Sequence, residues 1–202
     1  MNELMERRRA LMGGISAGAR NPIYQIRNTA VASGESISTG VRAFAADLAV
    51  TILLDFTADT NPTGSTSKGS IHKLLQMGST RELCIGKYNR TDETLSLWWM
   101  PASNSDKTAL TGVPSAAGRK RFAITHAANA NELQLKAKVN DGDVSSVTKT
   151  KSFAASDAIL SAGYYSDPPP EVNTAGLPTG TINRLAIYDT VLSDAEINAF
   201  LA

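Results

Sequence analysis

The segment from Ala49 to Phe56 limits the possible folds of this chain more than any other segment. Its most apolar positions fall on one side of an extended backbone, at Val50, Ile52, Leu54 and Phe56, while Thr51, Leu53 and Asp55 fall on the other. This period of two is that of a β-strand and hardly matches a helix. The segment predicts a strand that has at least one face in a core.

Similar short segments recur along the chain, and turn residues separate them. In Lys120–Ala127 the pattern buries Phe122 and Ile124, and in Glu132–Val139 the apolar residues alternate with outward polar ones. About eleven such strands, with hairpin spacing, predict two packed antiparallel sheets. We expect them at 23–26, 36–40, 49–56, 71–77, 82–88, 93–100, 120–127, 132–139, 144–150, 158–165 and in the first half of 180–202. The 144–150 strand is polar and edge-like, and 101–118, rich in Ser, Ala, Asn and Pro, is predicted as a surface loop.

The chain closes with a predicted helix. Ser193 is suited to cap its first turn, and Glu196 follows three residues later, which is the pattern of a capping box. Ile197, Phe200 and Leu201 are spaced to form one apolar face. We therefore expect this helix to end the chain against the core.

The sequence of this last segment, residues 180–202, resembles the end of laminin-G-like domains of the concanavalin A type. In those domains Gly-x-Ile is followed by Ile-Tyr-Asp and then by Leu-Ser-x-x-Glu-Ile. Here the matching residues are Gly180 and Ile182, then Ile187-Tyr188-Asp189, then Leu192-Ser193 with Glu196-Ile197. The resemblance implies an all-β fold, a two-sheet antiparallel jelly-roll sandwich, over residues 22–202.

Residues 1–21 are predicted to form a short helical arm and a linker outside the sandwich. An apolar stripe and a basic cluster mark the arm, at Leu4, Met5, Leu11 and Met12 and at Arg7, Arg8 and Arg9. About ten residues are too few for a stable isolated helix, so we expect the arm to dock on a partner; a frayed, solvated tail is the alternative.

The arginine-rich leader and the step Ile37-Ser38-Thr39-Gly40 resemble the opening of laminin-G-like proteins encoded by phages and prophages of gut bacteria. This resemblance implies a virion protein, assembled in the bacterial host cytoplasm, that contacts other virion proteins through its arm. A homo-oligomer is expected, with a trimer suggested by phage fibres.

Composition excludes several other classes of protein. The net charge of +1 provides no field that would attract nucleic acid, and no apolar run approaches the ~20 residues of a membrane span. The charged N-terminus does not match a signal peptide. Cys84, the single cysteine, cannot form an internal disulfide.

The sequence lacks a recognisable catalytic constellation. Retaining glucanases on this fold place two carboxylates on one strand face as Glu-x-Asp-x-Glu. Here Glu82, Asp92-Glu93 and Glu132 are isolated, so we expect no enzyme activity. His72 and His126 are expected as surface or satisfied core histidines, and Cys84 as a small packed thiol.

Laminin-G-like domains often hold calcium, which prefers six to eight oxygen ligands. The candidate carboxylates are Asp141 and Asp143 in one turn, and Asp157 with Asp167 if their loops meet. Ordinary turn chemistry explains aspartates at such positions, so no metal ligand and no cofactor is assigned, and a structural calcium ion stays an open alternative.

Trp98 and Trp99 are adjacent and must point to opposite faces of a strand. Leu95, Leu97 and Trp99 share the face expected in the core. Trp98 shares the other face with Ser96 and Met100 and offers a platform on which a sugar ring could stack, with Tyr164, Tyr165 and Asp167 as further contacts. Burial of Trp98 beneath the 101–118 segment, or a protein contact, is the alternative.

These features together predict a non-catalytic phage or prophage structural protein, in a decoration, head-fibre or tail-associated position. Its lectin-like domain would bind a glycan or host surface, or merely decorate the particle. A bacterial lectin-like or adhesion module is the first alternative, and a glycoside hydrolase is a distant second.

Overall fold

The computed structural model describes residues 20–32, 35–42, 47–59, 71–77, 83–88, 94–99, 107–114, 117–130, 132–150, 159–163 and 179–202. Within these ranges the side chains of 71–74, 76–77, 83–88, 94–99, 107–114, 149–150 and 163 are not described. The predicted N-terminal arm lies outside the described residues.

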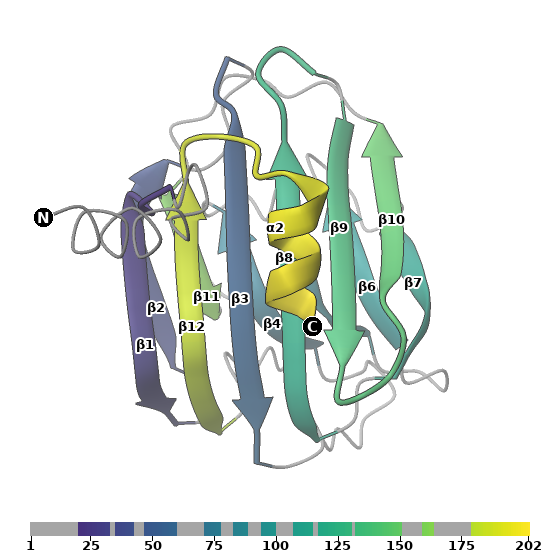
Figure 1. Ribbon diagram of the computed structural model, residues 1–202. Helices are drawn as coiled ribbons and strands as arrows, with labels where there is room; N and C mark the ends of the chain where they lie inside the picture. Colours follow the sequence, from purple (N-terminus) through teal and green to yellow (C-terminus); the bar gives the residue numbers. More distant parts are fainter. Residues whose placement is uncertain are drawn as a thin grey trace, which may run out of the picture.

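Twelve strands in the described ranges form two six-stranded antiparallel sheets. Sheet A has the order β1 (Tyr24–Val31), β12 (Gly180–Tyr188), β3 (Val50–Ala58), β8 (Gly118–His126), β9 (Glu132–Val139) and β10 (Ser145–Thr150). Sheet B has the order β2 (Ser36–Arg42), β11 (Ile159–Gly163), β4 (Ile71–Met77), β5 (Leu83–Tyr88), β6 (Thr94–Trp99) and β7 (Lys107–Pro114). Figure 1 shows sheet A in front of sheet B, with neighbouring strands in each sheet often distant in sequence.

The hydrophobic core lies between the two sheets. Its largest fully buried side chains are Phe56, Phe122, Ile52, Leu54 and Leu75. β3 and β8 supply Phe56 and Phe122, and Leu75 comes from β4 in the opposite sheet. The alternation predicted for these strands is therefore confirmed, and the fold is an all-β jelly-roll sandwich.

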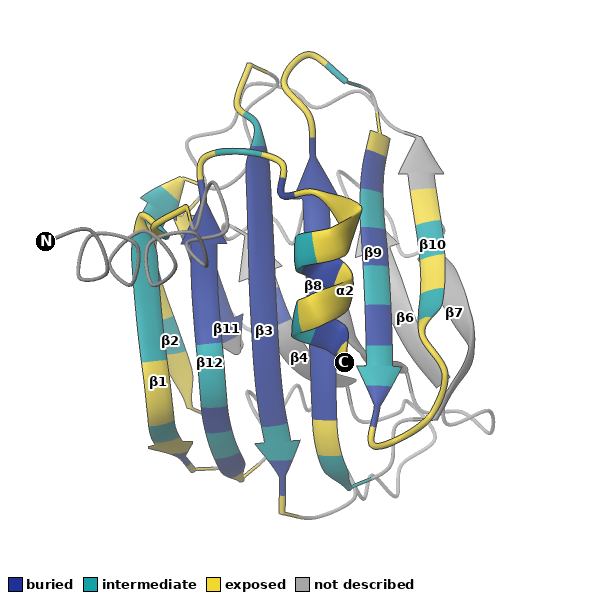
Figure 2. Ribbon diagram, viewed as in Figure 1, coloured by how far each residue is buried: buried dark blue, intermediate teal, exposed yellow. Residues whose placement is uncertain are grey.

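The outer face of sheet A carries a smaller apolar cluster under the C-terminal helix α2 (Asp194–Leu201). Leu53, Ala123 and Ala186 of the sheet pack with Leu192, Ile197 and Leu201, which are all buried. Figure 2 shows β3 buried along most of its length, because the core covers one face and α2 lies beside it on the other. No helix among the described residues is long and apolar enough to cross a bilayer.

The predicted capping box begins α2. Ser193 Oγ accepts a hydrogen bond from the Glu196 backbone N–H at 3.3 Å, and the Ser193 backbone N–H donates to Glu196 Oε2 at 2.8 Å. These bonds occupy donors that have no partner within a helix. They also lower the pKa of Glu196, because the hydrogen bonds from Ser193 favour the ionised carboxylate.

One sequence prediction was wrong. Part of the expected surface loop 101–118 forms β7, which pairs with β6 at the edge of sheet B. An edge strand needs hydrogen-bonding partners on one side only, so Pro114 is tolerated at its last position. The composition of β7 can therefore resemble that of a loop. Its strand conformation depends on pairing with β6. The one strand expected at an edge, 144–150, is β10, which lies at the edge of sheet A and pairs only with β9 among the described strands.

Candidate functional site

The predicted sugar platform falls on β6 of sheet B, for which the backbone pairing is defined. Leu97 is in register with Ile85, Ile85 with Leu75, and Leu75 with Ala162. Leu75 and Ala162 belong to the core, so this row is the inward one. The position of Trp98, next in the strand, is consequently on the outer face of sheet B.

Trp98 is in register with Cys84 on one side and Lys107 on the other. Ser96, two residues earlier, shares the outer face with Trp98. The side chains of Ser96 and Trp98 lie outside the described part of the structure, as do Tyr164, Tyr165 and Asp167, so their assignment to a sugar site stays a prediction. The arm residues Leu4, Met5, Arg7, Arg8, Arg9, Leu11 and Met12 also lie outside it.

The outer face of sheet A holds a described polar network centred on Asp55, whose side chain is 7% exposed. Arg119 Nε donates to Asp55 Oδ1 at 2.9 Å and to Oδ2 at 3.1 Å, and its Nη2 donates to Oδ2 at 2.5 Å. Asn183 Nδ2 donates to Oδ1 at 2.9 Å and to Thr57 Oγ1 at 2.8 Å. The hydrogen bond to Asp55 raises the pKa of Arg119 above its usual value.

This network is unsuited to acid–base catalysis. Both oxygens of Asp55 accept bonds from a permanent cation, and glycoside hydrolysis needs a second carboxylate a few ångströms away. Glu132 is exposed at the start of β9, and Glu82, Asp92 and Glu93 lie outside the described residues. The sequence did not single out the network, because Asp55, Arg119 and Asn183 come from three strands that only the fold brings together.

His126 is a buried core histidine, which is the second of the two alternatives expected from the sequence. It is 1% exposed, with Nδ1 2.9 Å from the Leu48 carbonyl oxygen and Nε2 3.0 Å from that of Ala130. Each ring nitrogen thus lies within hydrogen-bonding distance of a backbone carbonyl oxygen, and the nitrogen that carries the proton donates to its carbonyl. His72 pairs in register with Lys87, and its side chain is not described, like that of Cys84.

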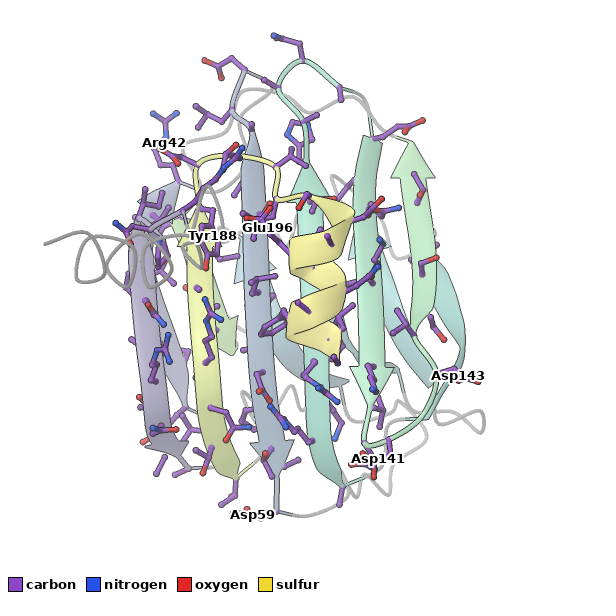
Figure 3. All side chains as sticks on the ribbon, in the orientation of Figure 1. Arg42, Asp59, Asp141, Asp143, Tyr188 and Glu196 are labelled. Atoms are coloured by element: carbon purple, nitrogen blue, oxygen red, sulfur yellow. The ribbon has the colours of Figure 1, made fainter. Side chains whose placement is uncertain are left out.

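Of the four calcium candidates, Asp141 and Asp143 lie within the described residues. Asp141 and Asp143 are exposed in the turn between β9 and β10, and Figure 3 shows them at the lower end of the sandwich. Within the described residues no three His, Cys, Asp or Glu side chains form a group that could hold a metal ion. Asp157 and Asp167 lie outside those residues.

Comparison of the whole structure with solved structures finds the same sandwich in carbohydrate-binding modules. A CBM40 module of a Ruminococcus gnavus sialidase, bound to α2,3 sialyllactose, matches with a TM-score of 0.61 and 17% identity over 90% of this chain and 100% of that one. A leech intramolecular trans-sialidase matches with a TM-score of 0.57 and 18% identity, over 92% of this chain and 28% of the trans-sialidase chain. A Limulus polyphemus pentraxin matches with a TM-score of 0.50 and 11% identity, over 92% of this chain and 79% of the pentraxin chain. These likenesses show the fold. No protein-family model and no curated protein sequence matches the chain.

Proposed function

We propose that this protein is a non-catalytic glycan-binding sandwich. One observation carries the proposal: this chain overlays all of an isolated carbohydrate-binding module, whereas it covers only 28% of the leech trans-sialidase. The size and fold are therefore those of one carbohydrate-binding module. The same module was solved with α2,3 and with α2,6 sialyllactose bound, so a sialylated glycan is the first ligand to test.

The proposed binding surface is the outer face of sheet B around Trp98. The register of β6 supports it, since Leu97 follows the core-facing row and Trp98 alternates with it. An aromatic ring at such a position stacks on the apolar C–H face of a sugar. Ser96 on the same face is suited to hydrogen-bond a hydroxyl group, and Tyr164, Tyr165 and Asp167 complete the proposed contacts.

The test is a glycan array with the full chain and two tryptophan variants. Trp98→Ala should abolish the array signal and leave the melting temperature nearly unchanged. Trp99→Ala, the matched control, should cost ~3 to 5 kcal/mol of unfolding free energy, since its position alternates into the core. Equal destabilisation by both variants would show that Trp98 is a packing residue.

Absence of catalysis is tested separately. Sialyllactose, laminarin, mixed-linkage glucan, agar and carrageenan should remain intact after prolonged incubation with the protein. A product that disappears in a single Glu or Asp variant would favour the glycoside hydrolase alternative instead.

We further propose that the sandwich is displayed on a phage or prophage particle. The support is the resemblance of the leader Glu6–Met12 and of Ile37–Gly40 to phage-encoded laminin-G-like proteins. Genes for capsid, portal or tail proteins beside this gene would support virion display. A neighbourhood of cell-surface or secretion genes would favour a bacterial adhesion module.

A further inference from the structure

Three adjacent strands of sheet A each expose one large apolar side chain at the same end of the sandwich. Ile23 precedes β1, Val191 follows β12 and Leu48 precedes β3, and their exposed fractions are 52%, 38% and 40%. The three strands are neighbours, and their register sets the beginnings of β1 and β3 beside the end of β12. Because neighbouring strands lie ~4.8 Å apart, the three strand ends span only ~10 Å. We call Ile23, Leu48 and Val191 the apolar end patch.

Hydrogen bonds fix the segments that carry the patch. Thr51 Oγ1 donates to the Thr190 carbonyl oxygen at 2.8 Å and accepts from the Leu192 N–H at 2.9 Å, one on each side of Val191. Leu48 lies three residues before Thr51, at the entrance to the same strand. The patch is therefore part of the folded sandwich, and its side chains are exposed on a fixed surface.

Exposed apolar side chains are concentrated at this end of the molecule. Of the five large ones in the described residues, Ile159 is a fourth at the same end, because it pairs with Arg42 at the close of β2. β2 follows β1 and runs back, so Arg42 lies at the end where β1 begins, and Figure 3 labels it there. The fifth, Val144, follows Asp143 at the opposite end. Apolar side chains that gather on a surface mark a contact with another segment or protein.

The chain enters the sandwich at the apolar end patch. Arg20 Nη1 donates to Thr190 Oγ1 at 2.6 Å and to the Val191 carbonyl oxygen at 3.2 Å. Residues 1–19 therefore join the sandwich beside Val191. The predicted linker, from Met12 to Arg20, spans roughly 28 Å at most. A tether this short keeps the arm at a roughly millimolar effective concentration beside the patch, which a second copy in dilute solution does not match.

The predicted arm and the patch are complementary in chemistry. The arm combines its apolar stripe with the basic run Arg7–Arg9. The patch is flanked by two exposed carboxylates, Asp47 next to Leu48 and Asp189 two residues before Val191. Apolar burial would supply most of the docking energy, because surface ion pairs contribute little each. The charges would therefore orient the arm on the patch.

We propose that the arm docks on the apolar end patch of its own sandwich, with its apolar stripe against the patch and its arginines beside Asp47 and Asp189. A helix of about ten residues is unstable alone, and the patch supplies the surface that it needs. Any partner of the arm, including a phage particle, must then displace the arm from the patch. The contact covers few side chains, so it governs access to the arm more than the melting temperature. The proposal is independent of glycan binding by sheet B.

Limited trypsin digestion of the full chain measures how often the arm is undocked, because cleavage after Arg7–Arg9 requires an accessible segment. Mass spectrometry identifies these first cuts. Leu48→Ser together with Val191→Ser should speed them about tenfold, since the apolar contact is lost. Asp47→Asn together with Asp189→Asn should speed them about threefold, since the carboxylates mainly orient the arm. All four positions are exposed, so the melting temperature should stay nearly unchanged.

The opposite end of the sandwich provides matched controls. Val144→Ser changes a side chain that is 47% exposed, and Asp141→Asn together with Asp143→Asn removes two exposed carboxylates from the adjoining turn. Neither change should alter the rate of cleavage after Arg7–Arg9. These controls separate docking at one end from a general effect of net charge or of a less apolar surface.

A spin label distinguishes docking on the chain's own patch from docking on a second copy. The label is attached at Gly13→Cys in a Cys84→Ser background. Nuclear magnetic resonance signals of the amides of 47–51 and 188–192 should broaden in the labelled protein, and far less when the patch carries its two serine substitutions. In an equal mixture of isotope-enriched protein without the label and labelled protein without enrichment, these signals should stay sharp.

Three results would overturn the proposal. Equal cleavage rates in the patch variants, the opposite-end controls and the unchanged chain would mean that the arm does not dock on the patch. Broadening in the mixed sample would assign the patch to a second copy. Broadening that the patch substitutions leave unchanged would place the arm elsewhere on the sandwich. If the serine substitutions lower the melting temperature, the variant of the two flanking carboxylates decides, and an unchanged cleavage rate in it contradicts docking.

Discussion

Lys120 is a lysine in an apolar environment. It is 4% exposed and lies in register between Phe56 and Val139, two residues of the core. Its amine reaches the Gly118 carbonyl oxygen at 3.4 Å. Loss of hydration lowers the pKa of Lys120 from 10.5 to about 8, because the buried site disfavours the ammonium form.

This pKa shift predicts a pH-dependent stability. Below pH 8 the amine is charged in both states, and the folded state bears the cost of burying it. Between about pH 8 and pH 10.5 the folded protein loses the proton first, so the unfolded state binds more protons and stability rises with pH. Lys120→Met should therefore raise the unfolding free energy at pH 7 by about 1 to 3 kcal/mol.

Urea unfolding at pH 7 and pH 10 measures this effect. The advantage of Lys120→Met should shrink at the higher pH, where the native amine is neutral in the folded protein. A constant difference between wild type and Lys120→Met at both pH values would contradict the predicted pKa.

Asp55 lies in register between Arg184 and Arg121 and binds Arg119, and these neighbouring cations predict a large effect of removing its charge. Asp55→Asn should lower the unfolding free energy by about 2 to 4 kcal/mol, because Arg119 loses its bidentate partner and the neighbouring cations lose their anion. Chemical unfolding at neutral pH and low salt measures the change.

A double-mutant cycle separates these two contributions. In an Arg121→Gln background the loss caused by Asp55→Asn should be smaller, since fewer cations depend on the carboxylate. Equal losses in both backgrounds would mean that Arg121 does not interact with Asp55.

At the scale of elements, β3 explains why the two sheets and α2 form one unit. Its inward residues fill the main core, and its outward Leu53 lies in the cluster under α2. The helix is also tied to the strand by Thr51, whose Oγ1 accepts from the Leu192 N–H at 2.9 Å and donates to the Thr190 carbonyl at 2.8 Å. The route from β12 to α2 is thereby held against the centre of sheet A.

This arrangement predicts different costs for two changes in α2. Ser193→Ala removes the cap and should cost about 1 kcal/mol, whereas Leu201→Ala opens a cavity over sheet A and should cost about 2 to 5 kcal/mol. Thermal unfolding followed by circular dichroism compares the two variants.

The effect of the cap should depend on pH. The folded pKa of Glu196 is lowered, so its contribution is present above the usual glutamate pKa of 4.5 and is lost as the pH falls through the folded value. The difference between wild type and Ser193→Ala should therefore narrow in acid. A difference that stays constant down to pH 3 would show that the capping box does not form.

At the scale of the whole molecule, the sandwich presents two outer faces with different chemistry. The face of sheet A is divided between α2 and the polar network centred on Asp55, and the face of sheet B carries the position of Trp98. A protein displayed on a particle could use both faces if it were attached through its N-terminal arm. Deletion of the arm therefore tests whether the arm attaches the sandwich to a particle.

Deletion of Met1 to Gly14 should leave a folded sandwich with nearly the same melting temperature as the full chain. The truncated protein should fail to join the assembly, because the apolar stripe of Leu4, Met5, Leu11 and Met12 and the basic Arg7 to Arg9 are the proposed attachment. Co-sedimentation with purified particles measures incorporation. Normal incorporation of the truncated protein would eliminate this role for the arm.

The sequence alone determined the local features of this protein. Period-two alternation identified β3, β8 and β9 and the inward residues Phe56, Phe122 and Leu135, because alternate side chains of a strand must point to opposite faces. The spacing of Ser193 and Glu196 likewise identified the start of α2, since a capping box is formed by residues three apart. Signals of this kind need only neighbouring residues.

Contacts between residues that are distant in the sequence depend on how the strands pair. Strand order and register place Arg27, Arg184, Asp55, Arg121 and Lys138 in one row, although they span most of the sequence. The edge strand β7 was missed for a related reason, since its hydrogen bonds are supplied by β6 and its own composition resembles a loop. Pairing between strands is a long-range interaction, and a shift of one residue would reverse every outward side chain. The charged row therefore exists only in the folded sheet.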